Sequence, residues 1–360
     1  MIDCDVHNDW ANADVLLPYM DPNFRDYLER GERVGGPQSF PHGHRPWLHP
    51  EDYKRQDLFA AEGLSVGADY DLMKRELLDK YDLEFAILTG EEIIDISTLA
   101  NPYYASAMAK ANNDYLLEHW LARDARLKGS LAVAPQDPEG AATEIRRLGH
   151  HPDIVQVMLS SGARRPYGEP FYHPIWEAAS EMDLPVAIHL GGTGGVNSDS
   201  SFTMAPTFYY EHHALLCELA MSHVASLIVQ GIFERWPNLS FIVMECGIAW
   251  LPAILWRLDN GYKALRKETP WLKRLPSEYA RDHIRFTTQP LEQPPNKEHL
   301  WSMLEAIDGK NTLLFASDYP HWDFDDPYQV AIPKDWHDNV FDLNIRQVYK
   351  KLPQHKPNVL

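Results

Sequence analysis

The run LSFIVME (residues 239–245) sets the architecture, together with the similar run PVAIHL (residues 185–190). Both runs are almost wholly apolar, as expected for strands whose two faces are covered by other elements. A helical pattern, HPIWEAASEMD (residues 173–183), precedes the second run, and a longer one, residues 215–236, separates the two. Strands that alternate with helices in this way indicate a parallel α/β sheet.

The same alternation extends along the whole chain. The eight candidate strands are Met1–Val6, Phe85–Thr89, Leu131–Ala134, Ile154–Leu159, Pro185–His189, Leu239–Glu245, Ile284–Thr287 and Thr312–Ser317. Further helical patterns cover residues 101–124 and 137–149, and a last helix is expected near residues 341–352. Eight such units favour a (β/α)8 TIM barrel over an open doubly wound sheet, in one domain spanning residues 1–360.

One segment, residues 9–80, breaks the alternation. It is rich in Pro, Gly, His and charge, as in VGGPQSFPHGHRPWLHPEDY (residues 34–53), and a helical pattern returns only at residues 69–83. A long insertion after the first strand of a barrel lies over the C-terminal mouth, where lids are found, so we expect a distorted barrel with such a lid. His42, His44 and His49 lack an acidic partner in this segment, and we interpret them as loop residues.

Composition excludes several classes of protein. The net charge of −19 disfavours a nucleic-acid-binding surface, which needs clustered Lys and Arg. The three cysteines, Cys4, Cys217 and Cys246, are widely spaced, which suits a reducing compartment better than a disulfide framework. The sequence has neither a signal-peptide pattern nor an apolar run of membrane-spanning length. We therefore expect a soluble, cytoplasmic protein.

Ionisable residues follow several of the predicted strands. Asp5 and His7 end the first, His189 ends the fifth, Glu245 ends the sixth, and Asp318 follows the eighth. Each has an ordinary interpretation when taken alone: a hydrogen-bonded core histidine, a turn-forming aspartate or a helix cap. Their coincidence at one end of the barrel instead favours a divalent metal site, because imidazoles and carboxylates are its usual ligands. In Asp-x-His, the period of two in a strand places both side chains on one face.

Four stretches resemble one branch of a known superfamily. They are MIDCDVHN (residues 1–8), HLGGTGG (189–195), GIFERWPNLSFIVMECGIAWLPAILWRLD (231–259) and LLFASDYPHWD (313–323). They resemble the amidohydrolase-2 branch of the amidohydrolase superfamily, which includes the aminocarboxymuconate-semialdehyde decarboxylase-like enzymes. The resemblance implies a distorted (β/α)8 barrel with one divalent metal ion, Zn²⁺ or Mn²⁺, at the C-terminal mouth. It implies metal ligation by Asp5, His7, His189 and Asp318.

The sequence departs from that branch at two positions. Relatives commonly carry His-x-His or Glu-x-His on the first strand, where this chain has Asp5-Val6-His7. Decarboxylase relatives carry a His after the sixth strand, where this chain has Glu245. Glu245 is thus a candidate ligand, proton carrier or orienting group. His212, His213 and His223 lie nearby in the sequence, and either of the first two is a candidate for the missing imidazole.

Two reactions suit this set of residues. In the first, a metal-dependent hydrolase, Asp318 accepts a proton from a metal-activated water and His189 holds the metal or polarises the scissile carbonyl. In the second, a non-oxidative decarboxylase, the substrate carboxylate binds the metal, and Asp318 or a nearby His protonates carbon. The changed sixth-strand residue favours the hydrolase. A third interpretation is a metal-free binding protein on the same barrel.

The substrate is expected to be a small organic molecule, aromatic or carboxylate-bearing. Candidate substrate-binding residues are His213, Arg165, His321 and Trp322. Arg165 and its neighbour Arg164 are suited to a substrate carboxylate, or are surface charges. The apolar segment around residues 215–229 suggests a subunit interface, so we expect a homodimer and neither nucleic-acid nor membrane partners.

Overall fold

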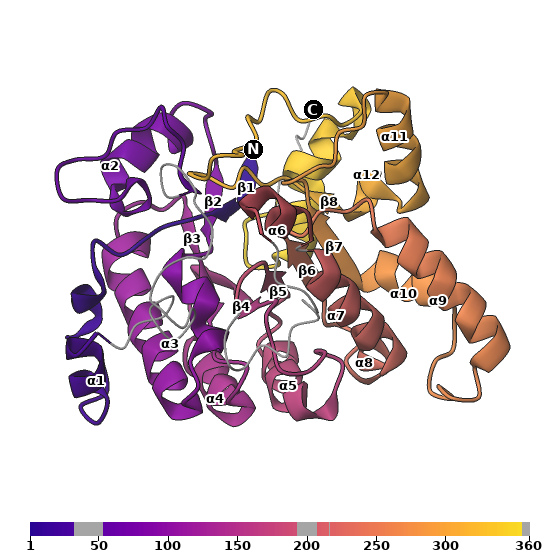
Figure 1. Ribbon diagram of the computed structural model, residues 1–360, viewed down its shortest axis with the longest axis horizontal. Coiled ribbons are helices and arrows are strands. Elements are labelled where there is room, and N and C mark those ends of the chain that lie inside the picture. Colours follow the sequence, from indigo (N-terminus) through magenta and orange to yellow (C-terminus); the bar gives the residue numbers. More distant parts are fainter. Residues whose placement is uncertain (32–52, 193–206, 216, 355–360) are drawn as a thin grey trace.

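The computed structural model describes residues 1–31, 53–192, 207–215 and 217–354, and its core is an eight-stranded parallel sheet (Figure 1). The strands are β1 (Ile2–Val6), β2 (Phe85–Leu88), β3 (Leu127–Ala132), β4 (Ile154–Ser160), β5 (Val186–His189), β6 (Phe241–Met244), β7 (Ile284–Thr287) and β8 (Leu313–Leu314). They pair in chain order from β1 to β8. The expected α/β barrel class is confirmed.

Backbone hydrogen bonds bring the last strand back to the first. Cys4 N–H donates to the Phe315 carbonyl (3.0 Å) and His7 N–H donates to the Tyr319 carbonyl (2.8 Å). Asp318 N–H donates to the Asp5 carbonyl (3.2 Å). The segment after β8 therefore continues the sheet beside β1, which nearly closes the barrel and fixes Asp318 next to Asp5.

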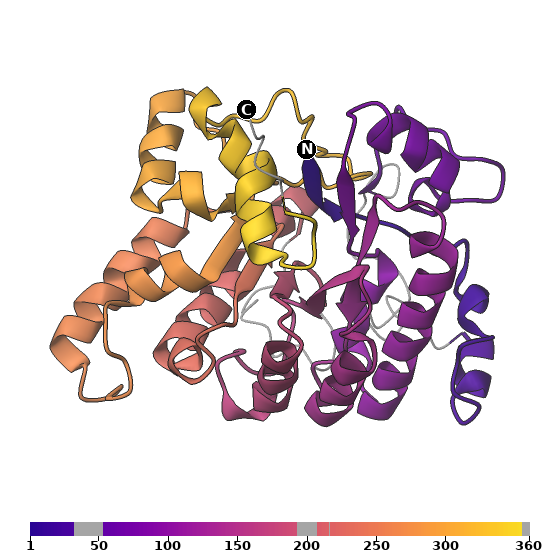
Figure 2. The same cartoon turned by 180° about the vertical axis from the view of Figure 1, so that it is seen from behind.

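Helices surround this sheet. They are α1 (Arg25–Glu29), α2 (Tyr70–Met73), α3 (Pro102–Leu116), α4 (Pro138–Leu148), α5 (His173–Glu181), α6 (Tyr209–Leu215), α7 (Cys217–Val229), α8 (Ile232–Arg235), α9 (Leu251–Leu265), α10 (Pro276–His283), α11 (Lys297–Ala306), α12 (Gly309–Thr312) and α13 (Asn344–Val348). Seen from behind, the C-terminal segment, in yellow, lies across the barrel near the N-terminus (Figure 2). Short 3₁₀ and π segments include η5 (Glu92–Thr98) and η6 (Leu117–Leu121).

Helix α4 forms as its sequence predicts. The Asp137 side chain accepts a hydrogen bond from Gly140 N–H (3.1 Å), and Pro138 occupies the first turn, where its missing N–H costs nothing. Ile145 on its inner face is fully buried. Burial of that face against the sheet, more than helix propensity, stabilises such a helix.

Strand β3 differs from the prediction. It begins at Leu127 and ends at Ala132, whereas the apolar pattern predicted residues 131–134. The apolar pattern did not predict the start of the strand because Lys128 is charged. In the fold, this side chain pairs with Asp153 at the edge of the barrel (2.5 Å). Gly129 is required there: a Cβ atom at this position would lie 2.9 Å from Leu121 and about as close to two other side chains.

The insertion after β1 contacts the barrel in two places. Its first part, with η1 (Ala13–Leu16) and α1, lies beside α3 on the outside of the barrel (Figure 1). Residues 53–55 reach the mouth, where Lys54 forms an antiparallel bridge with His321. The candidate loop residues His42, His44 and His49 lie outside the described residues.

The segment Tyr209–Val229, which contains α6 and α7, is long and apolar enough to cross a membrane by length and composition alone. Core helices of soluble proteins meet the same criterion. Ala220, Val224, Leu227 and Ile228 of α7 are fully buried in the barrel core. The expectation that the sequence contains no such apolar run is therefore corrected, while the packing of α7 is that of a core helix.

Candidate metal centre

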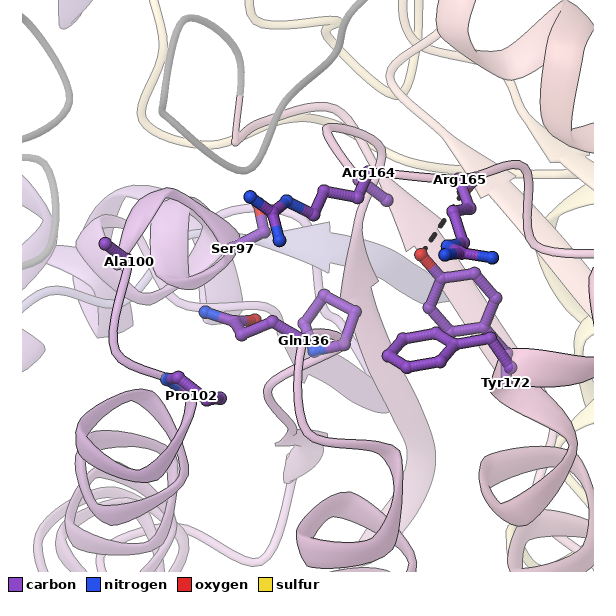
Figure 3. A pocket seen from close by; sticks show the side chains of 10 residues that line it. Ser97, Ala100, Pro102, Gln136, Arg164, Arg165 and Tyr172 are labelled. Carbon is purple, nitrogen blue, oxygen red and sulfur yellow. Dashed lines mark hydrogen bonds between the residues drawn. The ribbon is translucent and has the colours of Figure 1, made fainter.

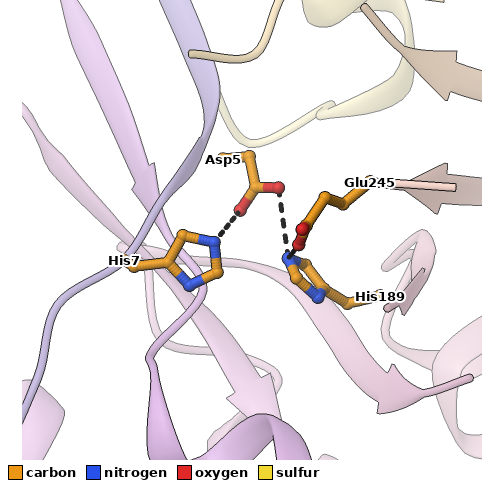
Figure 4. A group of neighbouring side chains, drawn as sticks. All are labelled: Asp5, His7, His189 and Glu245. Carbon is orange, nitrogen blue, oxygen red and sulfur yellow. Dashed lines mark hydrogen bonds and ion pairs between the residues drawn. The ribbon is translucent and has the colours of Figure 1, made fainter. Parts of the chain in front are cut away.

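Four buried side chains from different parts of the sequence converge at the carboxyl ends of the strands (Figure 4). Asp5 and His7 come from β1 and the residue after it, His189 is the last residue of β5, and Glu245 follows β6. One potential ligand atom from each lies within 4.8 Å of the others. A second group, with the same spacing, consists of His7, Glu245, Asp318 and His321.

The two strand histidines present the same ring nitrogen to the cluster. His7 Nδ1 lies 2.6 Å from the Gly90 carbonyl oxygen, and His189 Nδ1 lies 2.6 Å from the Leu190 carbonyl oxygen. Because a carbonyl oxygen only accepts, each Nδ1 carries a proton and donates it. In neutral imidazoles, Nε2 is then an acceptor with a free lone pair.

Those Nε2 atoms face carboxylate oxygens. His7 Nε2 lies 2.9 Å from Asp318 Oδ1 and 3.5 Å from Asp5 Oδ1. His189 Nε2 lies 3.1 Å from Asp5 Oδ2 and 3.6 Å from Glu245 Oε2. Among the described residues, buried His7 Nε2 and Asp318 Oδ2 have no hydrogen-bond partner. Imidazole nitrogens and carboxylate oxygens that converge in this way are the usual ligands of a divalent metal ion, so the cluster suits one.

Burial and neighbouring charges act differently on the two imidazoles. Burial, followed by the charge of His321, lowers the pKa of His7 to about 3, so that His7 is neutral at pH 7. Burial also disfavours charge on His189, but Asp5 and then Glu245 outweigh it and raise its pKa to about 9. Burial raises the pKa of Asp318 and of Glu245 well above their ordinary values.

Two of the site carboxylates occupy strained backbone positions. Glu245 has φ of 53° and Asp318 has φ of 58°, in the left-handed region that residues other than Gly rarely adopt. Glu245 directly follows β6, and Asp318 lies in the segment after β8 that pairs with β1. Strain of this kind is concentrated at functional sites and persists because surrounding contacts enforce it.

A second row of polar residues supports Asp318. His321 Nδ1 lies 2.7 Å from Asp318 Oδ1, and His321 Nε2 lies 3.2 Å from Glu91 Oε2. Lys54 from the insertion donates to Glu91. Burial alone would raise the pKa of Glu91, but Lys54 and His321 lower it well below its usual value. Glu91 is therefore an ionised carboxylate between two cationic or hydrogen-bonding partners.

An open cavity of about 710 Å³ lies over the cluster, and we call it the metal pocket. Its described lining residues are His7, Tyr53, Glu91, Ile94, Asp95, His189, Leu190, Gly191, Tyr209, Glu245, His321, Trp322 and Asp323. Four of these are carboxylates, and none of the described ones is Lys or Arg. Asp5 and Asp318 lie beneath this surface, with 1% and 0% exposed.

The candidate substrate-binding residues divide between two places. His321 and Trp322 line the metal pocket, and His213 lies at its edge, 3.2 Å from Asp323 Oδ2. Arg165 does not reach it. Arg165 pairs with Glu169 (3.1 Å) and lines a separate cavity (Figure 3).

Neither His213 nor His223 belongs to the described groups of side chains that could hold a metal ion. His223 is buried on α7, where its Nε2 contacts the Ser161 carbonyl oxygen (2.7 Å) and its ring stacks on Tyr167. The side chain of His212 lies outside the described part of the structure. The additional imidazole in the cluster is His321, whose ring centroid lies 4.3 Å from that of His7.

Glu91 and Lys54 were not predicted as residues of the site from the sequence. Glu91 follows β2 by three residues, so the rule that located the other strand-end residues also applies to it. Lys54 gave no signal, because it lies in a charge-rich segment and reaches the site only through the bridge with His321.

A parallel eight-stranded barrel with a polar, metal-suited cluster at its C-terminal mouth defines a class of barrel enzymes. The particular family follows from comparison with known sequences: the amidohydrolase family model matches residues 2–351. The chain belongs to the amidohydrolase family, in the amidohydrolase-2 branch, and is an enzyme of that family.

Two curated relatives share one name, gamma-resorcylate decarboxylase. Gamma-resorcylate decarboxylase of Polaromonas sp. (strain JS666) is 25% identical over 279 residues, which cover 73% of this chain and 79% of that protein. The enzyme of that name from Rhodococcus jostii (strain RHA1) is 25% identical over 283 residues, which cover 72% and 82%. The expectation of a hydrolase is wrong in the light of these relatives, which are decarboxylases.

A solved structure shares the fold. It is 5-carboxyvanillate decarboxylase from Novosphingobium aromaticivorans, complexed with manganese and 4-hydroxy-3-methoxy-5-nitrobenzoic acid. The TM-score is 0.69 at 22% identity, and the match covers 97% of this chain and 95% of that one. The expectation of one divalent ion, Zn²⁺ or Mn²⁺, agrees with the manganese in that structure and with the donor set described above.

Proposed function

We propose that this chain is a metal-dependent, non-oxidative decarboxylase of small aromatic carboxylates. The observation that carries the proposal is the convergence of two imidazole Nε2 atoms and several buried carboxylates at one point of the barrel mouth. The decarboxylase activity of the curated relatives supports this reaction over hydrolysis. The glutamate after β6 was the reason to prefer a hydrolase, and His321 offsets that change by bringing another imidazole to the cluster.

The residues proposed to hold the ion are Asp5, His7, His189 and Asp318. All four are at most 1% exposed, and each lies within hydrogen-bonding distance of another member. Asp5 is one methylene shorter than the Glu of some relatives, and Thr89 Oγ1 donates to its Oδ1 (2.6 Å), which orients the carboxylate. A bound divalent ion would hold the substrate carboxylate and an adjacent oxygen and neutralise their negative charge.

His321 is the proposed proton donor. It lines the metal pocket, whereas Asp318 is buried behind it with Oδ1 2.7 Å from His321 Nδ1. In the reaction the bond between the ring carbon and the carboxyl carbon breaks, and its electron pair stays on the ring carbon. That carbon takes a proton from His321, CO₂ leaves, and solvent reprotonates the imidazole. Asp318 Oδ1, beside His321 Nδ1, orients the imidazole for the transfer.

Aromatic side chains at the mouth suit a planar substrate. The Tyr53 and Tyr209 rings lie 4.8 Å apart, and Trp322 Nε1 donates to Tyr209 OH (3.4 Å). Rings of this kind bury flat ligands at low entropic cost. The carboxylates of Glu91, Asp95 and Asp323 in the lining favour hydroxyl groups on the substrate over a second carboxylate.

The test is an assay of the purified protein, loaded with Mn²⁺ or Zn²⁺, for CO₂ release from 2,6-dihydroxybenzoate, 5-carboxyvanillate and related hydroxybenzoates. We expect CO₂ release from at least one, its loss with a chelator and its recovery on adding back the metal. The absence of CO₂ from all of them, or full activity after chelation, would contradict the proposal.

The proposal also covers the binding partner, the compartment, the oligomeric state and the insertion. The partner is a small molecule rather than nucleic acid or membrane, and the protein acts in the cytoplasm as a homodimer. Cys4, Cys217 and Cys246 are free, as suits a reducing compartment. The insertion at residues 9–80 acts as a lid through Tyr53 and Lys54.

A further inference from the structure

A second cavity lies beside the metal pocket and shares none of its described lining residues. It has a volume of about 600 Å³, including its open mouth. Its lining consists of Ser97, Ala100, Pro102, Pro135, Gln136, Ala163, Arg164, Arg165, Phe171 and Tyr172 (Figure 3). We call it the Arg164 cavity. The turn at Gly191 and Gly192 separates the two cavities. Gly191 lines the metal pocket. Gly192 packs against Ser97, which lines the second cavity, so closely that a Cβ atom at position 192 would lie 2.0 Å from Ser97 Oγ.

The charges in the Arg164 cavity are opposite to those in the metal pocket. Two guanidinium groups line it, and none of its described lining residues is Asp or Glu. Arg165 already pairs with Glu169, but Arg164 is exposed and makes no side-chain ion pair or hydrogen bond with the described residues. Figure 3 shows the Arg164 side chain extending across the cavity towards Ser97, above Gln136. In a chain of net charge −19, an unpaired guanidinium over a cavity is suited to an anion.

Two buried polar atoms in the lining have no hydrogen-bond partner among the described residues. Ser97 is 2% exposed, and its Oγ is one of them. The Gln136 amide nitrogen donates to the Ile96 carbonyl (2.9 Å) and the Leu99 carbonyl (3.0 Å), which fixes the orientation of the amide. Gln136 Oε1 is the second such atom and remains available as an acceptor. Because buried polar groups without partners are unfavourable, a ligand that satisfies them gains affinity.

The rest of the lining is apolar. Pro102, Pro135, Ala163, Phe171 and Tyr172 supply the wall, and Phe171 also lies beneath the Arg165 guanidinium at 5.5 Å. A ligand that matches these features has three parts: a carboxylate for Arg164, a hydroxyl or amino donor for Gln136 Oε1, and a small apolar body for the wall.

We propose that the Arg164 cavity binds a small carboxylate that also carries a hydroxyl or amino group, at a site distinct from the metal pocket. The proposal does not depend on the reaction at the metal pocket. It assigns Arg164 to the carboxylate and Ser97 and Gln136 to the polar group of the ligand.

The experiment uses 4-hydroxybenzoate as the probe and the full-length, metal-loaded protein. Phenylglyoxal modifies accessible arginines, and mass spectrometry of the labelled peptides reads each arginine separately. We expect saturating 4-hydroxybenzoate to slow the modification of Arg164 at least fivefold. Arg146, an exposed arginine paired with Glu181 on the outer surface, is the matched control and should be unaffected. The uncharged analogue 4-hydroxybenzamide should protect Arg164 much less.

Two variants separate this site from binding at the metal pocket. Arg164→Ala should weaken the calorimetrically measured binding attributed to this site at least tenfold, while Arg164→Lys retains part of it. Arg164 is exposed and has no side-chain partner in the part of the chain that the structure describes, so replacing it carries little risk to folding. Ser97→Ala should weaken the same binding about threefold. The proposal is overturned if Arg164 is not protected, or if all binding of the probe is unchanged in Arg164→Ala and lost in His7→Ala.

Discussion

At the scale of single residues, the metal centre depends on the hydrogen bond that each imidazole makes through its Nδ1, on the side away from the cluster. The Gly90 and Leu190 carbonyls hold the Nδ1 protons of His7 and His189, so both Nε2 atoms must face the carboxylates. A carbonyl partner on the far nitrogen is the usual way in which proteins fix a metal-binding tautomer. The sequence could indicate only the candidate ligands, because the carbonyl partners depend on tertiary packing.

Replacing His7 by Ala removes one of these Nε2 atoms. We expect the variant to bind Mn²⁺ or Zn²⁺ at least about 100-fold more weakly, since even outer-shell changes weaken metal binding 10–100-fold. Metal analysis after dialysis against a competing chelator measures this. His213→Ala, which alters a histidine paired with Asp323 outside the cluster, is the control and should retain its metal. Equal metal content in wild type and His7→Ala would exclude His7 as a ligand.

Asp325 predicts a pH dependence of stability. Burial, and then the charge of Asp323, raise its pKa from 3.8 to about 7. The folded protein therefore holds this proton more tightly than the unfolded chain, and the contribution of Asp325 to stability falls as pH rises from about 4 to 7. Asp325→Asn should match wild type near pH 4 and have a higher Tm at pH 8, by about 2 °C or more.

Thermal unfolding at both pH values measures this difference. Asp335→Asn, which alters an exposed carboxylate, is the control and should show no such pH-dependent gain. A Tm difference between Asp325→Asn and wild type that is the same at pH 4 and pH 8 would contradict the assignment.

At the scale of elements, the period of the apolar residues predicted most of the barrel. Strands β1, β2, β4, β5, β6 and β7 lie where apolar runs predicted them, because strands buried on both faces need such runs. Strand β3 was displaced, since Lys128 and Ser130 interrupt the apolar run while the backbone still pairs with β2 and β4. Functional groups of barrel enzymes lie at strand ends, and this rule predicted that five residues lie together: Asp5, His7, His189, Glu245 and Asp318. It could not locate a residue of the insertion.

The docking of the insertion on the segment after β8 predicts a role for Lys54. Arg55 N–H donates to the Pro320 carbonyl (2.9 Å) and Trp322 N–H donates to the Tyr53 carbonyl (2.9 Å), which places Lys54 against Glu91. Without Lys54, Glu91 loses the cation that fixes it beside His321. Lys54→Met should lower kcat about tenfold or more, with metal content unchanged.

Steady-state kinetics with a metal assay on the same samples tests this. Lys74→Met removes an exposed lysine that pairs with Asp79, and it should keep wild-type kcat. An unchanged kcat in Lys54→Met, or a loss that follows metal loss, would contradict the role given to Lys54.

At the scale of the whole molecule, the distribution of charge and apolar surface is uneven. Carboxylates gather at the metal pocket, while arginines gather at the Arg164 cavity. Large apolar side chains are exposed on the α9 side, where Trp256 is 59% exposed, Leu265 56% and Trp271 45%. Exposed apolar side chains of this size are of the kind that a subunit interface buries.

We therefore predict a dimer that buries this side of the molecule. Sedimentation should give a mass about twice the 41.3 kDa of the chain, and Trp256→Glu should shift it to the monomer. Tyr103→Glu, at an equally exposed aromatic residue on α3, is the control and should stay dimeric. A wild-type monomer at micromolar concentration would contradict the prediction.

Cleavage of a carbon–carbon bond, followed by protonation of the ring carbon, distinguishes the proposed decarboxylase from a hydrolase. The most direct test follows one turnover in D₂O with a hydroxybenzoate labelled with ¹³C at its carboxyl group. We expect the label to leave as ¹³CO₂ and the product to carry one deuterium at the carbon that held the carboxyl. Retention of the label in the organic product, with an ester or amide hydrolysed instead, would contradict it.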